Sequence, residues 1–343
     1  MHMKDLSKVR KILNLLIQGV IFLLTCLFIY TQVFKKMNLE GLRDALQVYA
    51  ENPDFFSGLI LVVLFMLANW SLEALKWKYL IGKIEKVGFF RSYQAILAGI
   101  AVSSFIPNRV GEYFGRVYIL KTASRIEGIL ITIVGSMSQL LITILAGSAA
   151  MIVFIPKYMS SAGFGHGYLY YSLVAIITAL SLLLLAIYFR LSFLALLRER
   201  MLKNRLERFR KFFRVFGYYR QKELLVVILL SLARYLVFST QFFLLLLLFG
   251  VTIAYTDALL LIALIYFIMA VIPTIALTEL GIRGTVALYV FGFFFHHTGY
   301  APDAGNMGVF AASTILWLIN LGIPALVGTI FVFRLQFFRK TES

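Results

Sequence analysis

Long apolar stretches separated by short charged segments dominate the chain. Six of these stretches have roughly 20 residues or more, which is the length that a helix needs to cross the hydrocarbon core of a bilayer. They therefore predict six full membrane spans in an all-α polytopic membrane protein. The predicted spans cover residues 12–34, 55–77, 128–155, 169–189, 223–249 and 307–333.

Two further apolar stretches, 92–120 and 258–297, each contain a polar signature that begins with Ile-Pro. In both signatures a Glu follows the Pro after five or six residues, and an Arg lies four residues beyond the Glu. Because proline breaks a helix, each stretch predicts a re-entrant helical hairpin with its signature at the tip. We expect six residues to shape the two tips, namely Pro107, Asn108 and Gly111 in the first and Pro273, Thr278 and Gly281 in the second.

The distribution of Lys and Arg predicts which loops are cytoplasmic, because cytoplasmic loops carry an excess of both. Residues 1–11, the segment 190–222 and the C-terminal residues are basic, whereas the loop 298–306 has no Lys or Arg. Lys121 and Arg125 follow the first hairpin. Both termini are therefore expected in the cytoplasm, and the two hairpins are expected to enter from opposite faces.

The order of these elements repeats along a single transmembrane domain, residues 1–343. Residues 1–156 and 157–343 would each contain two spans, a hairpin and one more span. Three crossings per half is an odd number, so the second half must be inverted relative to the first. In the alternative interpretation the hairpin arms cross fully, which gives eight to ten transmembrane helices.

Composition supports a membrane protein and excludes several other classes. The chain is 61% hydrophobic and 14% charged, whereas an average soluble domain is about half apolar and a quarter charged. The formal charge of +17 then marks topology and affinity for anionic lipid, not nucleic acid. The one cysteine and the spacing of the histidines predict neither a disulfide nor a metal site, and we expect no cofactor.

The segment 190–222 carries eleven Lys and Arg residues together with several large apolar ones. It predicts either an amphipathic helix on the cytoplasmic leaflet or a basic cytoplasmic linker, and both interpretations stay open.

The two signatures place ionisable residues inside apolar sequence, where they are costly. Glu112 and Arg116 are four residues apart, as are Glu279 and Arg283, so each pair can form a salt bridge on one helix face. A buried ion pair gains little stability, and Arg forms bidentate hydrogen bonds with phosphate. We expect Arg109, Arg116 and Arg283 to receive a lipid phosphate in a midplane cavity, with the two Glu residues holding the Arg side chains when the site is empty. The alternative is that the pairs merely lock the hairpin tips.

Other polar residues lie within the predicted spans. Arg234 lies near mid-depth in the fifth span, and we expect Glu112 or Glu279 to be its partner. The substrate-binding residues are therefore predicted to be Arg109, Glu112, Arg116, Arg234, Glu279 and Arg283. The remaining polar and aromatic side chains receive structural roles: Glu73 with Lys76 as an anchoring pair near the inner interface, Trp70 and Trp77 in the interfacial belt, and Ser136, Ser138, Gln139 and Thr143 in interhelical hydrogen bonds.

The signatures also resemble a known family. The stretch 107–116 is similar to the P-x-R-x-G-E-x-x-R element of the flippase-like transmembrane domain of lysylphosphatidylglycerol synthases, with one extra residue between Glu and Arg. The stretch 279–284 is similar to the family's second motif, written around G-x-G-x-R-E, with Gly284 in place of the last Glu. The resemblance implies a lipid-translocating or lipid-handling membrane protein of bacteria or archaea. The chain ends ten residues after its last predicted span, so we expect the soluble synthase domain to be absent.

The resulting hypothesis is flipping of an anionic lipid, a phospholipid or a polyprenyl-phosphate-linked one, across the cytoplasmic membrane of a prokaryote. The chain would then not be an enzyme. Two alternatives remain, namely a membrane subunit that docks a lipid-modifying enzyme and an integral-membrane enzyme acting on lipid phosphates. The expected partners are the membrane and its anionic lipids. A second copy of the chain or a separate lipid-modifying enzyme stays open as a further partner.

Overall fold

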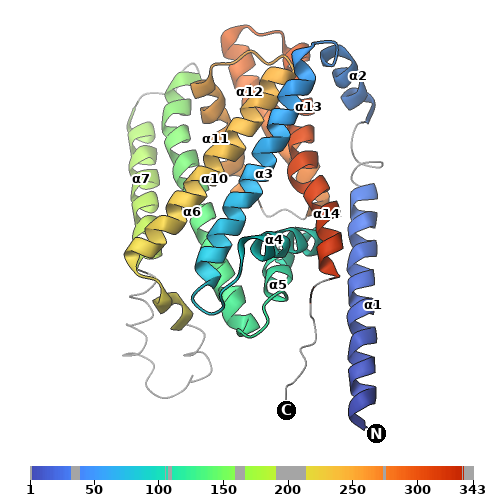
Figure 1. Cartoon of the computed structure of the whole chain (residues 1–343). Coiled ribbons are helices and arrows are strands. Elements are labelled where there is room, and N and C mark those ends of the chain that lie inside the picture. The colour runs from blue at the N-terminus through green and yellow to red at the C-terminus, as the bar shows by residue number, and fades with distance from the viewer. Residues whose placement is uncertain are drawn as a thin grey trace.

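The computed structural model in Figure 1 describes residues 2–31, 39–104, 106, 110–158, 167–190, 214–272, 276–333 and 335. Over these residues the chain is helical and contains no strand. The helices form a tall bundle, and α1 (His2–Tyr30) begins toward the same end of it at which α14 (Ile323–Val332) finishes.

Six of the helices are long and apolar enough to cross a membrane, counted over the part of the chain that the structure describes. They confirm the six predicted spans to within a few residues at most boundaries. The first five are α1 (His2–Tyr30), α3 (Asp54–Ile81), α6 (Arg125–Tyr158), α7 (Tyr168–Phe189) and α10 (Gln221–Leu248). The sixth runs through α13 (Pro302–Trp317), the π-helical segment η5 (Leu318–Gly322) and α14 (Ile323–Val332). Two short elements, α2 (Leu39–Tyr49) and η4 (Arg214–Tyr218), precede α3 and α10.

The last span is widened at η5 because Pro324 lies in the first turn of α14. Proline has no backbone amide, and its ring clashes with the preceding turn, so the regular hydrogen-bond ladder cannot continue through it. Single π-helical turns inside α-helices occur frequently at functional sites. Here the turn brings Asn320 and Leu321 to the wall of the cavity described below.

The helix breaks predicted at the signatures are present. In the first, α4 (Phe89–Ser103) ends shortly before α5 (Gly111–Val117) begins, and in the second, α11 (Tyr255–Val271) ends shortly before α12 (Ala276–Thr298) begins. Figure 1 shows α4 and α5 toward the end of the bundle at which α1 begins, whereas α12 reaches the opposite end.

The arms of the two helix pairs differ in length. With 15 and 7 residues, α4 and α5 extend about 23 and about 10 Å, so neither crosses a hydrocarbon core of about 30 Å. With 23 residues, α12 extends about 35 Å. Whether either pair is re-entrant in a membrane stays a prediction.

Glycines allow the first helix pair to pack backbone against backbone. A Cβ atom on Gly115 would lie 2.6 Å from the Cα atom of Gly99, and one on Gly111 would lie 2.6 Å from the carbonyl oxygen of Val102. Small residues are the usual means of close helix approach in membranes. The α4–α5 pair is therefore held in a compact arrangement that fixes where the α5 side chains point.

Several predictions fall outside the described residues. These include Pro107, Asn108, Arg109 and Pro273, together with residues 191–213 of the basic segment. The two interpretations of the segment 190–222 therefore both stand.

Candidate functional site

A cavity of about 480 Å³ lies inside the bundle and is lined by residues of α3, α5, α6, α10, α11, α12 and α13 with η5. Both signatures contribute to its wall. Its charged lining residues are Glu73, Lys76, Glu112, Arg116, Arg234, Glu279 and Arg283. The structure thus places five of the six predicted substrate-binding residues around one cavity, and the sixth, Arg109, lies outside the described residues.

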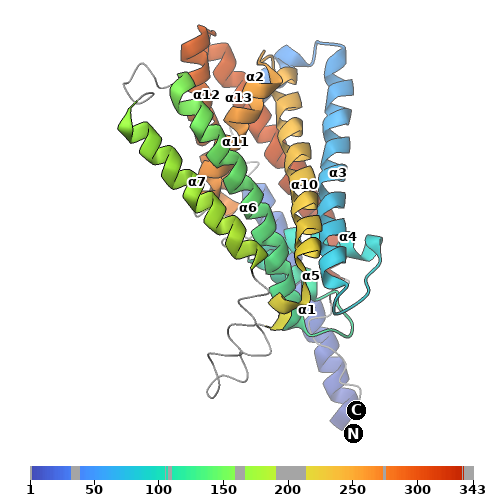
Figure 2. The same ribbon diagram turned by 90° about the vertical axis from the view of Figure 1, so that its left-hand side faces the viewer.

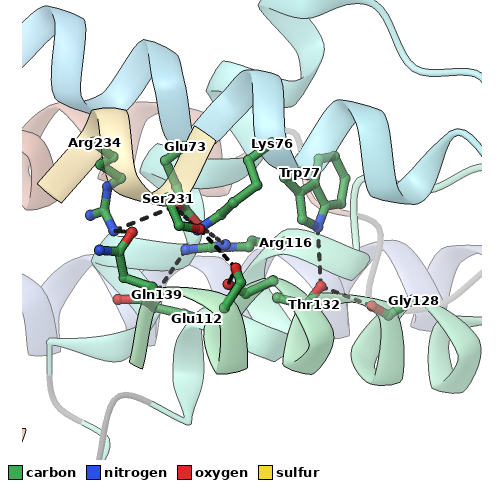
Figure 3. Close-up of polar contacts among 12 residues, drawn as sticks. Glu73, Lys76, Trp77, Glu112, Arg116, Gly128, Thr132, Gln139, Ser231 and Arg234 are labelled. Carbon is green, nitrogen blue, oxygen red and sulfur yellow. Dashed lines mark hydrogen bonds and ion pairs between the residues drawn. The ribbon is translucent and has the colours of Figure 1, made fainter. Parts of the chain in front are cut away.

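Glu73 on α3 is the centre of an ionic cluster (Figure 3). Its Oε1 accepts a hydrogen bond of 2.7 Å from Nη1 of Arg116 on α5. Its Oε2 lies 2.8 Å from Nζ of Lys76 and 3.4 Å from Nη1 of Arg234 on α10. Glu73, Lys76 and Arg116 are 4%, 1% and 3% exposed, respectively. One buried carboxylate therefore joins cations from three different helices.

This cluster corrects the structural role expected for Glu73 and Lys76. The predicted second span ends at residue 77, which would put Glu73 close to the interface, but α3 continues to Ile81. Glu73 therefore lies eight residues from the end of the helix, or about 12 Å along it. Lys76 also donates a hydrogen bond of 3.4 Å to Ser231 on α10, so both residues of the pair face the bundle interior.

The two tryptophans of α3 were also expected at the interface, and that expectation is wrong. Trp77 is fully buried and donates a hydrogen bond of 3.0 Å to the hydroxyl of Thr132 on α6. Trp70 is buried as well and lines the cavity. The longer course of α3 moves both side chains away from its end and into contacts with neighbouring helices.

The predicted salt bridges within the signatures are both present. Nη2 of Arg116 donates to Oε2 of Glu112 at 2.7 Å, and Nη2 of Arg283 donates to Oε1 of Glu279 at 2.7 Å. The guanidinium of Arg116 thus divides its two terminal nitrogens between Glu112 and Glu73. The same two nitrogens form a fork that could instead bind one carboxylate or phosphate group through two parallel hydrogen bonds.

Arg234 lies halfway along α10, as predicted, but its partners differ from those expected. Its Nη1 lies 3.4 Å from Glu73 and donates a hydrogen bond of 3.3 Å to Oε1 of Gln139 on α6. Its guanidinium also lies over the ring of Trp70, 5.1 Å from the centroid, a distance that permits a cation–π interaction. These partners follow from the packing of α10 against α3 and α6, which is visible for α3 in Figure 2.

Ser136, Gln139 and Thr143, which the sequence assigned to interhelical hydrogen bonds, also line the cavity. Gln139 fits that assignment through its bond from Arg234 on α10, and Ser138 fits it because its hydroxyl lies 2.7 Å from that of Ser231. The sequence could have predicted that Gln139 lines the cavity. Residues 136, 139, 140 and 143 are separated by three or four positions and therefore share one face of α6.

A neutral network of Asn69, Gln241 and Asn320 connects α3, α10 and η5. Asn69 donates to Oδ1 of Asn320 at 3.3 Å, Asn320 donates to Oε1 of Gln241 at 2.9 Å, and Gln241 donates to the carbonyl of Val62 at 2.8 Å. Such interhelical amide bonds stabilise membrane bundles. This network positions the π-helical turn against the two central helices.

The two tip glycines that the structure describes differ in their surroundings. Gly111 sits where a Cβ atom would collide with α4, whereas a Cβ atom on Gly281 would meet no atom within 4 Å among the described residues. Thr278 lies in α12, and its side chain is outside the described residues. Close backbone packing therefore explains why the first signature has a glycine at position 111, but it does not explain Gly281 in the second.

The described residues contain no group of three or more His, Cys, Asp or Glu side chains that could hold a metal ion. The carboxylates of the cavity instead contact Lys and Arg. This arrangement of cations is therefore suited to binding an anion. A bound anion could take the place of a carboxylate as the partner of a Lys or Arg side chain.

Comparison with known proteins supports the resemblance seen in the signatures. Residues 12–339 match the family described as the lysylphosphatidylglycerol synthase TM region. The chain belongs to this family. No curated protein matches the chain. Membership in the lysylphosphatidylglycerol synthase TM family, together with the six apolar helices, makes it a multi-pass membrane protein related to lipid modification or translocation.

In this member of the family the described lining residues of the cavity carry a net positive formal charge. Among the described lining residues there are four cations and three carboxylates, which leaves a formal charge of +1. In a low-dielectric interior, charges act more strongly than they do in water. A ligand that carries one negative charge would bring the cavity to neutrality.

Proposed function

We propose that the protein translocates an anionic lipid, a phospholipid or a polyprenyl-linked phosphate, between the leaflets of a prokaryotic cytoplasmic membrane. The observation that carries this proposal is the convergence of both signatures on one positively charged cavity. Its volume of about 480 Å³ lies within the range of roughly 300–1,000 Å³ that ligand pockets have. The headgroup would occupy the cavity while the acyl or prenyl chains stay in the bilayer.

In this mechanism the arginines recognise the phosphate and the carboxylates hold the arginines when no lipid is bound. Arg116 already presents two donors to two carboxylate oxygens, and Arg283 presents one to Glu279. A phosphate oxygen entering the cavity would replace a carboxylate oxygen at a similar distance and angle. Because one anion replaces another, the cations are never left uncompensated during the exchange.

We further propose that the two halves form an inverted repeat. The packing of the helices supports this, because several contacts between helices have counterparts at the corresponding positions of the other half. The first arm of one hairpin, α4, packs against the last span at α14, and the first arm of the other, α11, packs against the third span, α6. The outer helices follow the same rule, since α1 packs on α14 and α7 packs on α6.

A glycine lies at each of the two contacts, that of α4 with α14 and that of α11 with α6. A Cβ atom on Gly328 of α14 would lie 2.1 Å from the carbonyl oxygen of Leu97 on α4, and one on Gly147 of α6 would lie 2.3 Å from Cβ of Phe267 on α11. Inverted repeats with a site at their interface are the usual basis of alternating access in transporters. A site between the two signatures would then open to one leaflet at a time.

We propose transport and not catalysis for this cavity, because each of its three carboxylates contacts a Lys or Arg side chain and is thereby positioned to hold a cation.

The test is movement of a fluorescent anionic lipid between the leaflets of proteoliposomes, with a zwitterionic lipid as the control substrate. Losing a charge-assisted hydrogen bond costs roughly 1.5–3 kcal/mol, so Arg116→Ala and Arg283→Ala should slow the anionic lipid at least about tenfold. Arg116→Lys and Arg283→Lys keep the charge but lose the fork, and we expect partial activity from them.

Arg43→Ala is the matched control, because Arg43 is an exposed arginine on α2 and its loss should leave the rate unchanged. Folding of each variant is checked by size-exclusion chromatography and thermal unfolding in detergent. Wild-type rates from well-folded Arg→Ala variants would show that the signature pairs are structural locks, and the proposal would be abandoned.

A further inference from the structure

Glu73 contacts three cations of the cavity, although it belongs to neither signature. We propose that Lys76, Arg116 and Arg234 form the phosphate subsite, and that Glu73 is a resident anion which the lipid phosphate displaces. This inference rests on the proposed function, and it identifies where in the cavity the phosphate binds and what it replaces.

The geometry around Glu73 matches the needs of a phosphodiester. A carboxylate and a phosphodiester each carry one negative charge spread over two terminal oxygens. The two oxygens of Glu73 lie 2.7 Å from Arg116, 2.8 Å from Lys76 and 3.4 Å from Arg234. Three cations from α3, α5 and α10 therefore already converge on a group of the ligand's charge and shape.

Exchange is favoured over simple release of the carboxylate. If Glu73 moved away with nothing in its place, three cations would face one another in a buried site, and uncompensated buried charges are strongly destabilising. Arg116 would keep Glu112 as a partner, and Arg234 would keep Gln139. Each of these two arginines thus has a second contact that holds it in position while its anion changes.

The charge of the cavity favours a monoanion. The described lining residues include four cations and three carboxylates, so one added negative charge would bring their sum to zero, whereas a zwitterionic headgroup would leave it at +1. The second signature contains one cation by sequence, Arg283, so we propose that Arg283 helps to recognise the anion in the cavity but does not form the phosphate subsite by itself. The three-cation cluster is therefore the better subsite.

The decisive variant is Glu73→Gln, which removes the competing charge and nearly preserves the shape. Purified, delipidated full-length protein is titrated in detergent with dioleoyl phosphatidylglycerol, or with dioleoyl phosphatidylcholine, and bound lipid is counted by native mass spectrometry. Removing one charge-assisted competitor should lower the Kd for phosphatidylglycerol about tenfold. Transport of the same lipid in proteoliposomes should become several-fold slower. In Glu73→Gln no carboxylate is present to displace the bound phosphate from the three cations, so the lipid is released more slowly.

Glu279→Gln adds the same formal charge elsewhere in the cavity and is the comparison variant. It should tighten binding at least about threefold less than Glu73→Gln does, and the control Glu51→Gln at an exposed turn position should leave the Kd unchanged. Equal tightening by Glu73→Gln and Glu279→Gln would mean that net charge alone sets the affinity, and the displacement proposal would then be wrong.

A double variant covers the case in which Glu73→Gln does not fold. Glu73→Gln with Lys76→Met removes one charge of each sign, so the cavity stays at +1 while Arg116 and Arg234 remain. We expect it to bind phosphatidylglycerol at least about threefold more tightly than the wild type, and equal affinity would overturn the inference. A different result would contradict the proposed function itself. The wild-type protein would then show no preference for phosphatidylglycerol over phosphatidylcholine in binding, and it would not transport phosphatidylglycerol.

Discussion

At the scale of single residues, Glu85 shows how one carboxylate fixes the base of the first helix pair. It lies between α3 and α4, and its Oε2 accepts hydrogen bonds from the amides of Lys121, Thr122 and Ala123 at 3.0, 2.8 and 3.1 Å. Arg91 at the start of α4 lies 3.3 Å from its Oε1. The segments that enter and leave the α4–α5 pair are thus held by one side chain, which keeps α5 and its Arg116 in place.

These contacts predict a pH dependence of stability. Burial raises the pKa of Glu85, but the amide hydrogen bonds of residues 121–123 outweigh it and lower the pKa from 4.5 to about 2. The carboxylate therefore contributes stability that is fully present above pH 4.5 and is lost as the pH falls toward 2. Glu85→Gln should lower stability at pH 7 by roughly 1 kcal/mol, since the site is partly solvated.

The measurement is thermal unfolding in detergent between pH 7 and pH 2.5, comparing the wild type with Glu85→Gln and with the exposed control Glu51→Gln. The difference in Tm between the wild type and Glu85→Gln should be constant above about pH 5.5 and should shrink below pH 4.5. A difference that stays constant down to pH 2.5 would show that the charge of Glu85 is not what holds the turn.

Residue-level prediction from the sequence succeeded where both partners lie on one helix. Glu112 with Arg116 and Glu279 with Arg283 follow from the four-residue spacing alone. The partners of Arg234 did not follow, because spacing along one chain segment does not reveal which face of α10 meets α3 and α6. Glu73 was misplaced because a helix end in an apolar run is uncertain by several residues, and four residues move a side chain about 6 Å.

At the scale of elements, close backbone contacts at glycines determine how the helix pairs sit in the bundle. Gly328 lets α14 approach α4, where a Cβ atom would lie 2.1 Å from the carbonyl oxygen of Leu97. The helix boundaries could be predicted, because an apolar run and a proline are local features. The packing partners could not, because a glycine in an apolar run marks a close contact without identifying the helix that makes it.

This contact predicts opposite effects for two Gly→Ala substitutions. Gly328→Ala must push α14 away from α4, and overpacking of this kind costs roughly 1–3 kcal/mol. At Gly292 in α12 a Cβ atom would meet no atom within 4 Å, so Ala should be neutral or stabilise the helix by up to about 1 kcal/mol. Thermal unfolding of both variants in one detergent tests the pair, and equal Tm values would contradict the close contact of α14 with α4.

At the scale of the whole molecule, the arrangement of charge and apolar length predicts the path of the chain through the membrane. The six spans are present in the described part of the chain, and α1 begins toward the same end of the bundle at which α14 finishes (Figure 1). The presence of the cavity could be predicted from the two polar signatures. Its centre could not, because Glu73 becomes a site residue only when α3, α5 and α10 are brought together.

The inverted topology requires the loop after α3 and the loop after α12 to face opposite sides of the membrane. Lys86 and Ala301 are exposed positions in these two loops. In a Cys26→Ser background, which removes the single native cysteine, Ala301→Cys should react in intact cells with an impermeant thiol reagent. Lys86→Cys should react only after permeabilisation, because the Lys and Arg residues around it mark a cytoplasmic loop.

The reagent's access is verified with both variants in permeabilised cells, where each should be labelled to a similar extent. Exposure of both cysteines on the same side would require an even number of crossings between them. Between positions 86 and 301 the proposed topology contains three spans, α6, α7 and α10, and two helix pairs that each return to their own face. Equal labelling of intact cells at both positions would therefore exclude the inverted repeat, and with it the alternating exposure of the cavity to the two leaflets.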